Sequence, residues 1–371
     1  MNKIKVMTVF GTRPEGIKMA PIIKELEKRD NVENIICITA QHREMLDQVL
    51  NLFQIEADYD LNIFKPGQSL TEITTRTLEG LEEVIKKEKP DLLLVQGDTT
   101  TVFAGALAAF YQKVKIGHVE AGLRSGNLYS PYPEEANRKL TGIMTDFHFA
   151  PTEESRNNLL KEDYPEDKIF ITGNTVIDAL QYAIQEDYKF NLPLLNELDY
   201  ENKRIILLTS HRRENIGKPM ENIFSAVNNI VNKYEDVELV FPIHLNPKVR
   251  EIAHGKFNNN PKVHIIEPLD YEPFTNLMAK SHLIVTDSGG LQEEAPSLGK
   301  PVLVVREETE RPEGVEAGTA KLVGTDYDKV YKEIDILLSN DEEYKKMANA
   351  VNPYGDGKAA ERIVDVIINS L

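Results

Sequence analysis

Three carboxylates occupy positions at which a folded chain could use them for acid–base chemistry. Asp98 and Glu120 each end a short apolar run, and Glu134 follows Pro133 at the start of a predicted helix. Because the carboxyl ends of parallel strands meet at one edge of a sheet, Asp98 and Glu120 are expected to face one crevice. Gathered carboxylates raise one another's pKa values, so that one stays protonated as an acid while another acts as a base. The alternative for Asp98 and Glu134 is that each only caps a helix.

Basic turns follow other apolar runs and predict a site for phosphate groups. Gly11 opens a turn into a helix, and Arg13 and Lys18 lie near the N-terminus of that helix, which favours anions. In the second half, His211 is followed by two arginines, a pattern that suits a diphosphate, and its imidazole can move a proton near neutral pH. The alternative is a set of plain polar turns with solvated charges.

A glycine-containing turn, Ser288–Gly290, opens a helix that is predicted to end at Gly299. Its glycines allow close approach to the backbone, and the helix N-terminus offers free N–H groups to phosphate. Glu294, one turn into this helix, could reach ribose hydroxyls. Arg311 adds a cation near the same edge.

Other chemistries lack their motifs. Gly11 and Gly16 are not followed by the Lys-Ser/Thr pair of a P-loop, and they do not complete a dinucleotide-binding Gly-x-Gly-x-x-Gly pattern. The eight histidines are scattered, and no Asp-x-Asp pattern accompanies the acidic motifs. No Gly-x-Ser-x-Gly elbow is present. The sequence therefore predicts no nicotinamide cofactor, no metal site and no serine triad.

Twelve short runs rich in Val, Ile and Leu are typical of parallel strands buried on both faces, because turn residues and a helical pattern follow each. The first six are Ile4–Phe10, Asn34–Ala40, Asp91–Asp98, Lys115–Glu120, Asp146–Pro151 and Ile169–Asn174. The second six are Arg204–Ser210, Val237–Ile243, Val263–Glu267, Leu283–Asp287, Pro301–Arg306 and Ala320–Val323. The segment 182–203 carries no strand signal and is the predicted join. Two doubly wound α/β domains follow, with a substrate expected in the cleft between them.

Length and charge set the class of protein and its partners. A chain of 371 residues favours two domains at roughly 100–200 residues each. The net charge of −17 argues against a nucleic acid or an anionic membrane as partner. Cys37 lies in an apolar run and is predicted to be a small buried strand residue. No run reaches the roughly 18 apolar residues that span a bilayer, and the first apolar run is too short for a signal peptide, so a cytoplasmic location is expected.

Eight motifs, in order along the chain, together resemble the non-hydrolysing UDP-N-acetylglucosamine 2-epimerases. They are Phe10–Glu15, Thr39–Arg43, Gln96–Thr99, His118–Arg124, Pro133–Arg138, His211–Asn215, Asp287–Gly290 and Asn352–Gly357. The resemblance implies the glycosyltransferase-B architecture, an α/β fold with two Rossmann-like domains and a central cleft. We expect an N-terminal domain at residues 1–175, with the C-terminal helix 354–371 packing back on it, and a UDP-binding domain at 176–353.

The resemblance also implies an activity. Members of the family interconvert UDP-N-acetylglucosamine (UDP-GlcNAc) and UDP-N-acetylmannosamine (UDP-ManNAc) without a cofactor, by elimination and re-addition of UDP through 2-acetamidoglucal, and supply ManNAc units for cell-surface polysaccharides. The family's catalytic residues match Asp98, Glu120, Glu134 and His211. Its substrate- and UDP-binding residues match Arg13, Lys18, Arg212, Phe274, Ser288, Gly289, Gly290, Glu294 and Arg311, and Phe274 is expected to line the uracil pocket.

Regulation and assembly are implied in the same way. Bacterial members are often activated by a second UDP-GlcNAc, through residues that match Gln41, Arg43, Arg212 and His244. Family members are commonly homodimers. Three rival functions stay open: a glycosyltransferase that needs an acceptor, a hydrolysing epimerase that releases free N-acetylmannosamine, and a non-catalytic sensor of the nucleotide sugar. The sensor is disfavoured because a pure binder gains little from carboxylates near a diphosphate.

Overall fold

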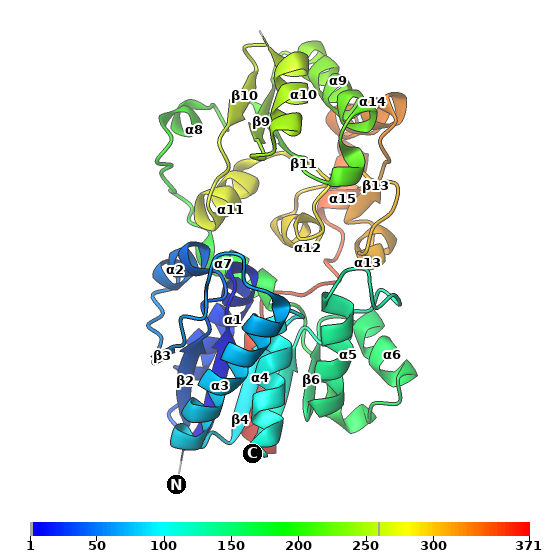
Figure 1. Ribbon diagram of the computed structural model, residues 1–371. Helices are drawn as coiled ribbons and strands as arrows, with labels where there is room; N and C mark the ends of the chain where they lie inside the picture. Colours follow the sequence, from blue (N-terminus) through cyan, green and yellow to red (C-terminus); the bar gives the residue numbers. More distant parts are fainter. Residues whose placement is uncertain (1–2, 259) are drawn as a thin grey trace. The chain divides into compact units, whose positions relative to one another are not determined.

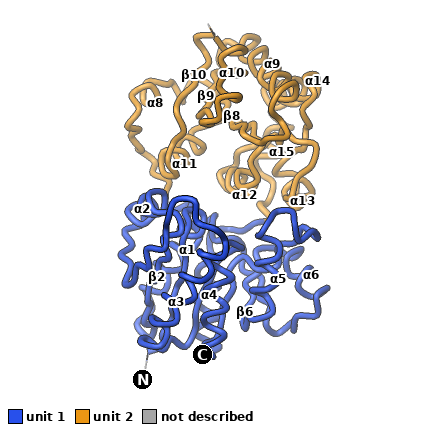
Figure 2. The backbone as a smooth tube through the Cα atoms, in the orientation of Figure 1, with its two compact units in different colours: residues 1–182, 354–371 blue, residues 183–353 orange. Residues whose placement is uncertain are grey.

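The computed structural model describes residues 3–258 and 260–371, and the chain forms two compact units. Unit 1 comprises residues 1–182 and 354–371, and unit 2 comprises residues 183–353 (Figure 2). Each unit contains one parallel sheet with helices between its strands (Figure 1).

Unit 1 is built on a seven-stranded sheet with the order β3-β2-β1-β4-β5-β6-β7. Its strands are β1 (Ile4–Phe10), β2 (Val32–Ile38), β3 (Tyr59–Asp60), β4 (Leu92–Gln96), β5 (Lys115–Val119), β6 (Phe147–Ala150) and β7 (Ile169–Ile171). Its helices are α1 (Arg13–Leu26), α2 (Arg43–Leu52), α3 (Leu70–Glu88), α4 (Thr100–Tyr111), α5 (Glu134–Met144), α6 (Glu153–Lys161), α7 (Thr175–Ala183) and α16 (Ala359–Ser370).

Helices cover both faces of this sheet, which explains why its central strands are continuously apolar. Helices α3, α4 and α5 pack in turn against one another, and α1 packs against α2 and α16. Met7 and Val9 of β1 and Cys37 of β2 lie in one core cluster with no exposed surface. Cys37 is therefore the small buried strand residue that the sequence predicts, and burial raises the pKa of its thiol to about 12.

Unit 2 is built on a six-stranded sheet with the order β10-β9-β8-β11-β12-β13. Its strands are β8 (Arg204–Thr209), β9 (Val237–Pro242), β10 (Val263–Ile266), β11 (Leu283–Thr286), β12 (Val302–Val304) and β13 (Ala320–Leu322). Its helices are α8 (Pro193–Glu197), α9 (Lys218–Lys233), α10 (Pro247–Phe257), α11 (Tyr271–Lys280), α12 (Leu291–Glu294), α13 (Pro312–Glu316), α14 (Tyr327–Ser339) and α15 (Asp341–Ala348).

The strand order reverses once in each sheet, and this reversal is where doubly wound proteins bind ligands. In unit 1 the chain moves outward from β1 through β2 to β3 and then crosses to β4 on the other side of β1. In unit 2 the equivalent reversal separates β8 from β11. The prediction of two Rossmann-like α/β sheets is confirmed.

The C-terminal segment belongs to unit 1. Asp178 of α7 accepts hydrogen bonds from the first two backbone N–H groups of α16, at 3.3 Å from Ala359 and 2.9 Å from Ala360. The apolar face of α16, including Ile363 and Ile367, is fully buried. A helix capped and buried in this way is an integral part of the fold around α1.

Three elements differ from the sequence-based expectation. Strand β2 begins at Val32, two residues before the predicted Asn34, and ends at Ile38. The two-residue strand β3 extends the first sheet beyond the six predicted strands. The helix predicted after Gly290 is only four residues of α12, followed by a 3₁₀ turn at Ala295–Leu298. Pro296 lacks the N–H group that a continuing α-helix needs. The helical segment still ends at Gly299, whose φ of +65° suits glycine.

Candidate active site

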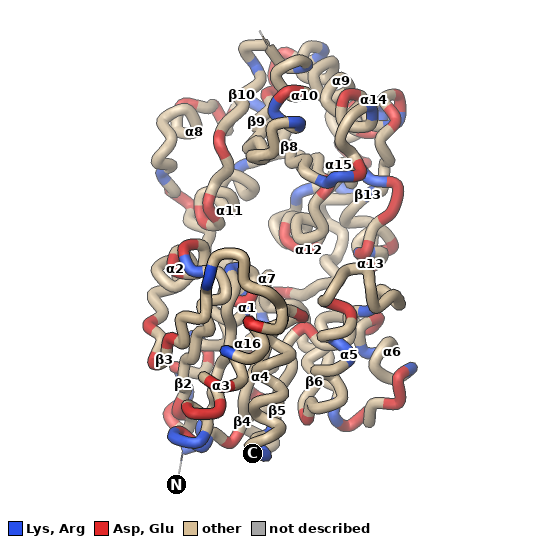
Figure 3. Tube along the Cα trace, viewed as in Figure 1, with Lys and Arg blue, Asp and Glu red and all other residues tan. Residues whose placement is uncertain are grey.

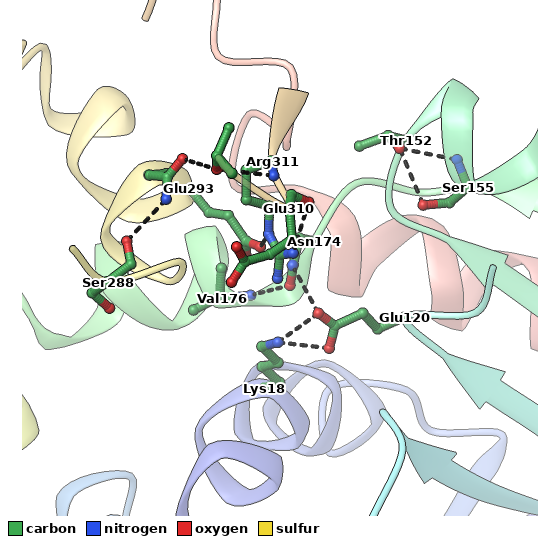
Figure 4. Close-up of polar contacts among 12 residues, drawn as sticks. Lys18, Glu120, Thr152, Ser155, Asn174, Val176, Ser288, Glu293, Glu310 and Arg311 are labelled. Carbon is green, nitrogen blue, oxygen red and sulfur yellow. Dashed lines mark hydrogen bonds and ion pairs between the residues drawn. The ribbon is translucent and has the colours of Figure 1, made fainter. Parts of the chain in front are cut away.

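Glu120 is held at the end of β5 by donors that include Lys18, Gln96 and Asn174. Lys18 Nζ lies 2.6 Å from both carboxylate oxygens (Figure 4). Gln96 donates to Oε2, and Asn174 Nδ2 donates to Oε1 at 3.4 Å. Glu120 has a φ of +63°, a conformation that costs a non-glycine residue roughly 1–3 kcal/mol. These contacts therefore fix a buried carboxylate in a backbone position that it would not adopt by itself.

Asp98 follows the neighbouring strand β4, so the sheet brings it to the same edge as Glu120. Its Oδ2 accepts a hydrogen bond of 2.6 Å from Arg138. The turn before it is fixed by His118, whose Nε2 lies 2.7 Å from the carbonyl oxygen of Gly97. Burial lowers the pKa of His118 to about 4, so the ring is neutral and donates to this carbonyl.

Glu134 is the first residue of α5, where the helix dipole favours a negative charge. Its Oε2 is buried and has no hydrogen-bond partner among residues 3–258 and 260–371. The adjacent Glu135 is fully buried and accepts the backbone N–H groups of Ser125, at 3.0 Å, and Gly126, at 3.2 Å. Glu135 therefore fixes the loop before α5, whereas Glu134 keeps acceptor capacity for another group.

The turn after β1 contains Arg13 and a buried acid, Glu15. The backbone N–H of Gly11 donates to Glu15 Oε2 at 2.6 Å. Burial raises the pKa of Glu15 to about 7, although hydrogen bonds from Thr99 and Gly11 act in the opposite direction. The Arg13 guanidinium makes no ion pair within the described chain. This turn follows β1, which borders the strand-order reversal of unit 1.

His211 lies after β8 and pairs with a fully buried carboxylate after β11. Its Nδ1 is 3.1 Å from Oδ1 of Asp287, and its ring stacks on that of His244 with centroids 5.8 Å apart. Burial would raise the pKa of Asp287, but hydrogen bonds from His211 and from the backbone amide of Arg212 outweigh it and lower that pKa.

Arg212 and Gly289 lie together at the same reversal. Arg212 donates through Nε to the carbonyl oxygen of Asp287 at 3.3 Å and through Nη2 to Glu310 Oε1 at 3.1 Å. A Cβ atom on Gly289 would lie 3.0 Å from Glu310 and 3.8 Å from Arg212. The backbone N–H of Ser288 is engaged by Thr286 Oγ1 at 2.9 Å. An anion at this turn would therefore meet Arg212 and compete with Glu310 for it.

Four further predicted ligand-binding residues belong to unit 2. Arg311 forms an ion pair with the buried Glu293 (Figure 4). Glu294 ends α12 and raises the pKa of the buried Tyr271, in addition to the larger effect of burial. Phe274 lies half-buried on α11. Gly290 has an ordinary helical φ of −62°, and a Cβ atom there would contact nothing within 4 Å.

The residues predicted to bind an activator are divided between the units. Gln41 accepts a hydrogen bond of 2.9 Å from Thr101, and Arg43 forms ion pairs with Asp47 and Asp60. In unit 2, His244 Nδ1 accepts the backbone N–H of Asn246 at 3.1 Å. Within each unit the structure places these side chains at the carboxyl ends of strands.

Sequence reasoning missed the residues that orient the predicted acids and His211. Gln96 and Asp287 lie inside quoted motifs, next to the residues that carried the argument, but a motif does not show which neighbour a side chain contacts. Asn174 is separated from Glu120 by 54 positions, and only the pairing of β5, β6 and β7 explains its contact. Polar residues directly at the ends of apolar runs are the signal that could have found Gln96 and Asp287.

Two general properties bear on the class of site. Among the described helices, none combines the length and the apolar character that a bilayer crossing requires. The described residues also contain no group of three His, Cys, Asp or Glu side chains arranged to hold a metal ion.

Two doubly wound parallel sheets with charged and glycine-containing turns at their reversals define an α/β protein of the glycosyltransferase-B class. A family model described as UDP-N-acetylglucosamine 2-epimerase matches residues 24–368. The chain belongs to this family, which confirms the resemblance that the motifs carry.

Similar proteins match over nearly the whole chain. The UDP-N-acetylglucosamine 2-epimerase of Bacillus subtilis is 58% identical, covering 99% of this chain and 96% of that protein. The UDP-GlcNAc 2-epimerase of Neisseria meningitidis bound to UDP-GlcNAc has a TM-score of 0.86 at 54% identity, covering 98% of this chain and 100% of that one. The UDP-GlcNAc 2-epimerase of Methanocaldococcus jannaschii in complex with UDP-GlcNAc and UDP has a TM-score of 0.78 at 39% identity, covering 98% of this chain and 99% of that one.

Proposed function

We propose that this protein interconverts UDP-GlcNAc and UDP-ManNAc by inversion at C2 of the sugar. The observation that carries the proposal is the placement of Asp98 and Glu120 after adjacent strands, beside the strand-order reversal of unit 1. Inversion at a carbon that bears a weakly acidic hydrogen requires groups that remove and return a proton. Family membership supports the same reaction.

The proposed step is an elimination followed by re-addition. A base removes the proton from C2, the C1–O bond to UDP breaks, and the electron pair of the C2–H bond forms the C1=C2 double bond of 2-acetamidoglucal. UDP leaves with the electron pair of the C1–O bond. In the second half, UDP adds back to C1, and a proton is delivered to the other face of C2. The atoms balance without an oxidant or a reductant.

Asp98, Glu120, Glu134 and His211 are the proposed acid and base groups. Glu120 is held by Lys18, whose positive charge stabilises its ionised form. Glu134 Oε2, buried without a partner in the described residues, is an acceptor suited to a substrate proton. The proposal assigns these four residues to the proton transfers as a group.

Basic and glycine-containing turns are the proposed ligands of the diphosphate. The groups are Arg13, Lys18, Arg212, Ser288, Gly289, Gly290 and Arg311. They would stabilise the charge that develops on UDP as the C1–O bond breaks, which is how arranged donors lower such barriers. Glu294 would bind the ribose and Phe274 would line the uracil pocket.

Proton NMR of the full chain with UDP-GlcNAc in D2O tests this function, with EDTA present and no nicotinamide added. We expect UDP-ManNAc that carries deuterium at C2. Free N-acetylmannosamine released in equal amount with UDP would instead indicate a hydrolysing epimerase. An unchanged spectrum with line broadening of the ligand would contradict the proposal and favour a sensor or an acceptor-dependent transferase.

Assembly and cellular role are part of the same proposal. Phe110 and Tyr111 at the end of α4 are 56% and 65% exposed, and Ile143 on the adjacent α5 is 74% exposed. Exposed apolar patches of this kind mark protein interfaces, and we propose that this face joins two copies of the chain. We also propose a cytoplasmic enzyme that supplies ManNAc units for surface polysaccharides and is activated by a second UDP-GlcNAc.

A further inference from the structure

Asp287 is a buried carboxylate whose two oxygens have different partners. Oδ2 accepts hydrogen bonds from Ser210 Oγ at 3.0 Å, from the backbone amides of His211 at 2.9 Å and Arg212 at 3.0 Å, and from Asn215 Nδ2 at 3.1 Å. Oδ1 lies 3.1 Å from the imidazole Nδ1 of His211 and 3.1 Å from its backbone nitrogen. Oδ2 therefore organises the loop, and Oδ1 faces the ring.

We propose that Asp287 is a positioning residue that fixes the tautomer of His211, with the proton on Nδ1 and the lone pair on Nε2. A carboxylate offers only acceptors, so the ring nitrogen that contacts it must carry hydrogen. The opposite nitrogen, Nε2, is then the one that can take a proton from a substrate and return it. The kinetic consequence of this inference rests on the proposed function, whereas the tautomer itself does not.

The neighbours of the ring are consistent with one fixed orientation. Asp287 has no exposed surface, whereas the His211 side chain is 39% exposed. The ring of His244 stacks on that of His211 at an interplanar angle of 23°, which restricts its rotation. A buried acceptor on one side and an accessible edge on the other form the same arrangement that orients a catalytic histidine in hydrolases.

The substitution Asp287→Asn separates this role from support of the loop. A carboxamide has one oxygen, and the four donors around Oδ2 require it, so the amide nitrogen takes the place of Oδ1. Its N–H group then points at Nδ1, which must become an acceptor. We expect the neutral ring of His211 to change from the Nδ1–H to the Nε2–H tautomer.

The measurement is a long-range ¹H–¹⁵N correlation spectrum of the full chain labelled with ¹⁵N-histidine, at a pH where the ring is neutral. The His211 signals are assigned by their loss in His211→Gln. We expect Nδ1–H in the wild type and Nε2–H in D287N, with a kcat for C2 exchange at least about tenfold lower and a KM within about threefold. Ser210→Ala is the control, because it removes one Oδ2 donor and leaves Oδ1 in place.

The outcomes are distinguishable. An Nε2–H tautomer in the wild type overturns the inference without any need for a folded variant. A D287N protein that keeps the Nδ1–H tautomer and the wild-type kcat also overturns the inference. The inference is overturned as well if the S210A variant changes the tautomer of His211. If the tautomers behave as expected but the wild type shows no C2 exchange, the positioning role stands and the proposed function fails.

Discussion

Gly290 is a glycine for which the surrounding unit gives no steric or conformational reason. Its backbone is helical, and an added methyl group would meet open space. By contrast, a Cβ atom on Gly122 would lie 2.2 Å from the carbonyl oxygen of Ser155, so the fold itself requires that glycine. A glycine with open space around it, in a turn proposed to hold phosphate, is best explained by close approach of a ligand.

We therefore predict that Gly290→Ala weakens binding of UDP without loss of stability. The added methyl group restricts the unfolded chain, which favours the folded state by up to about 1 kcal/mol, but it occupies the space next to the diphosphate. Calorimetric titration with UDP should show a dissociation constant about tenfold higher, at an unchanged or higher melting temperature. Gly255→Ala is the control, because Gly255 on α10 is equally open. Equal affinity of G290A and wild type would contradict the prediction.

At the scale of elements, the strands were predictable and some of their neighbours were not. A strand buried on both faces is visible as an apolar run, which is why β8 to β13 lie within the predicted ranges. The strand β3 has two residues, Tyr59 and Asp60, and no periodicity can reveal so short an element. It forms because Cys37 and Ile38 of β2 offer an open edge. Helix α12 is short because of Pro296, a residue that the prediction did not weigh.

The candidate site was predictable to the same degree. The ends of strands indicate which turns carry chemistry, so Asp98, Glu120 and His211 could be selected from the sequence. The partners of these residues depend on packing between strands that are far apart in sequence. Asp287 is 76 positions from His211, and only the pairing of β8 with β11 brings the two together.

Strands β5 and β6 carry a pair of buried histidines that makes stability depend on pH. His118 and His148 are register partners, and burial lowers their pKa values to about 4 and about 3. Because the unfolded state binds protons at higher pH than the folded state does, this contribution to stability is complete above about pH 6.5 and is lost as the pH falls toward 4. When the pH falls from 7 to 5, protonation linked to each histidine should lower the free energy of unfolding by about 2 kcal/mol.

The substitution His148→Phe should reduce this loss, because phenylalanine keeps a ring beside Tyr164 and does not titrate. Urea unfolding at pH 7 and pH 5 measures the difference. Glu15 has the opposite effect, because its raised pKa makes the fold more stable as the pH falls. Both the wild type and H148F contain Glu15, so its effect cancels in the comparison. The exposed His254→Phe is the matched control and should keep the wild-type dependence. If H148F loses as much unfolding free energy between pH 7 and pH 5 as the wild type does, burial of His148 does not cause that loss.

At the scale of the whole molecule, charge and apolar surface have separate consequences. Acidic and basic residues both occur throughout the two units (Figure 3), and the net charge is −17. A negative net charge favours solubility and disfavours binding of nucleic acid. The exposed apolar side chains on α4 and α5 are the feature that predicts self-association.

We predict that light scattering coupled to size-exclusion chromatography gives the mass of a dimer, and that Ile143→Glu gives the mass of a monomer. A glutamate at the centre of an apolar interface would bury an unpaired charge, which a weak dimer cannot compensate. Val351→Glu is the control, because Val351 is 84% exposed and lies in unit 2. A wild-type monomer at all concentrations would contradict the dimer.

We further predict that the initial rate depends sigmoidally on UDP-GlcNAc concentration, as the proposed activation by a second molecule requires. His244→Ala should remove the sigmoidal component, whereas His254→Ala, at an exposed position on α10, should keep it. Rates measured over a hundredfold range of substrate test this. A hyperbolic curve for the wild type over the whole range would exclude activation.

The two stretches that build unit 1 have a consequence for synthesis of the protein. Unit 2 is one uninterrupted segment, whereas α16, which buries Ile363 and Ile367 and is capped by Asp178, is translated after it. A ribosome therefore releases all of unit 2 before unit 1 can complete its core. A chain that terminates within unit 2 leaves uncovered the apolar face of unit 1 that α16 packs against, and such exposed apolar surface promotes aggregation.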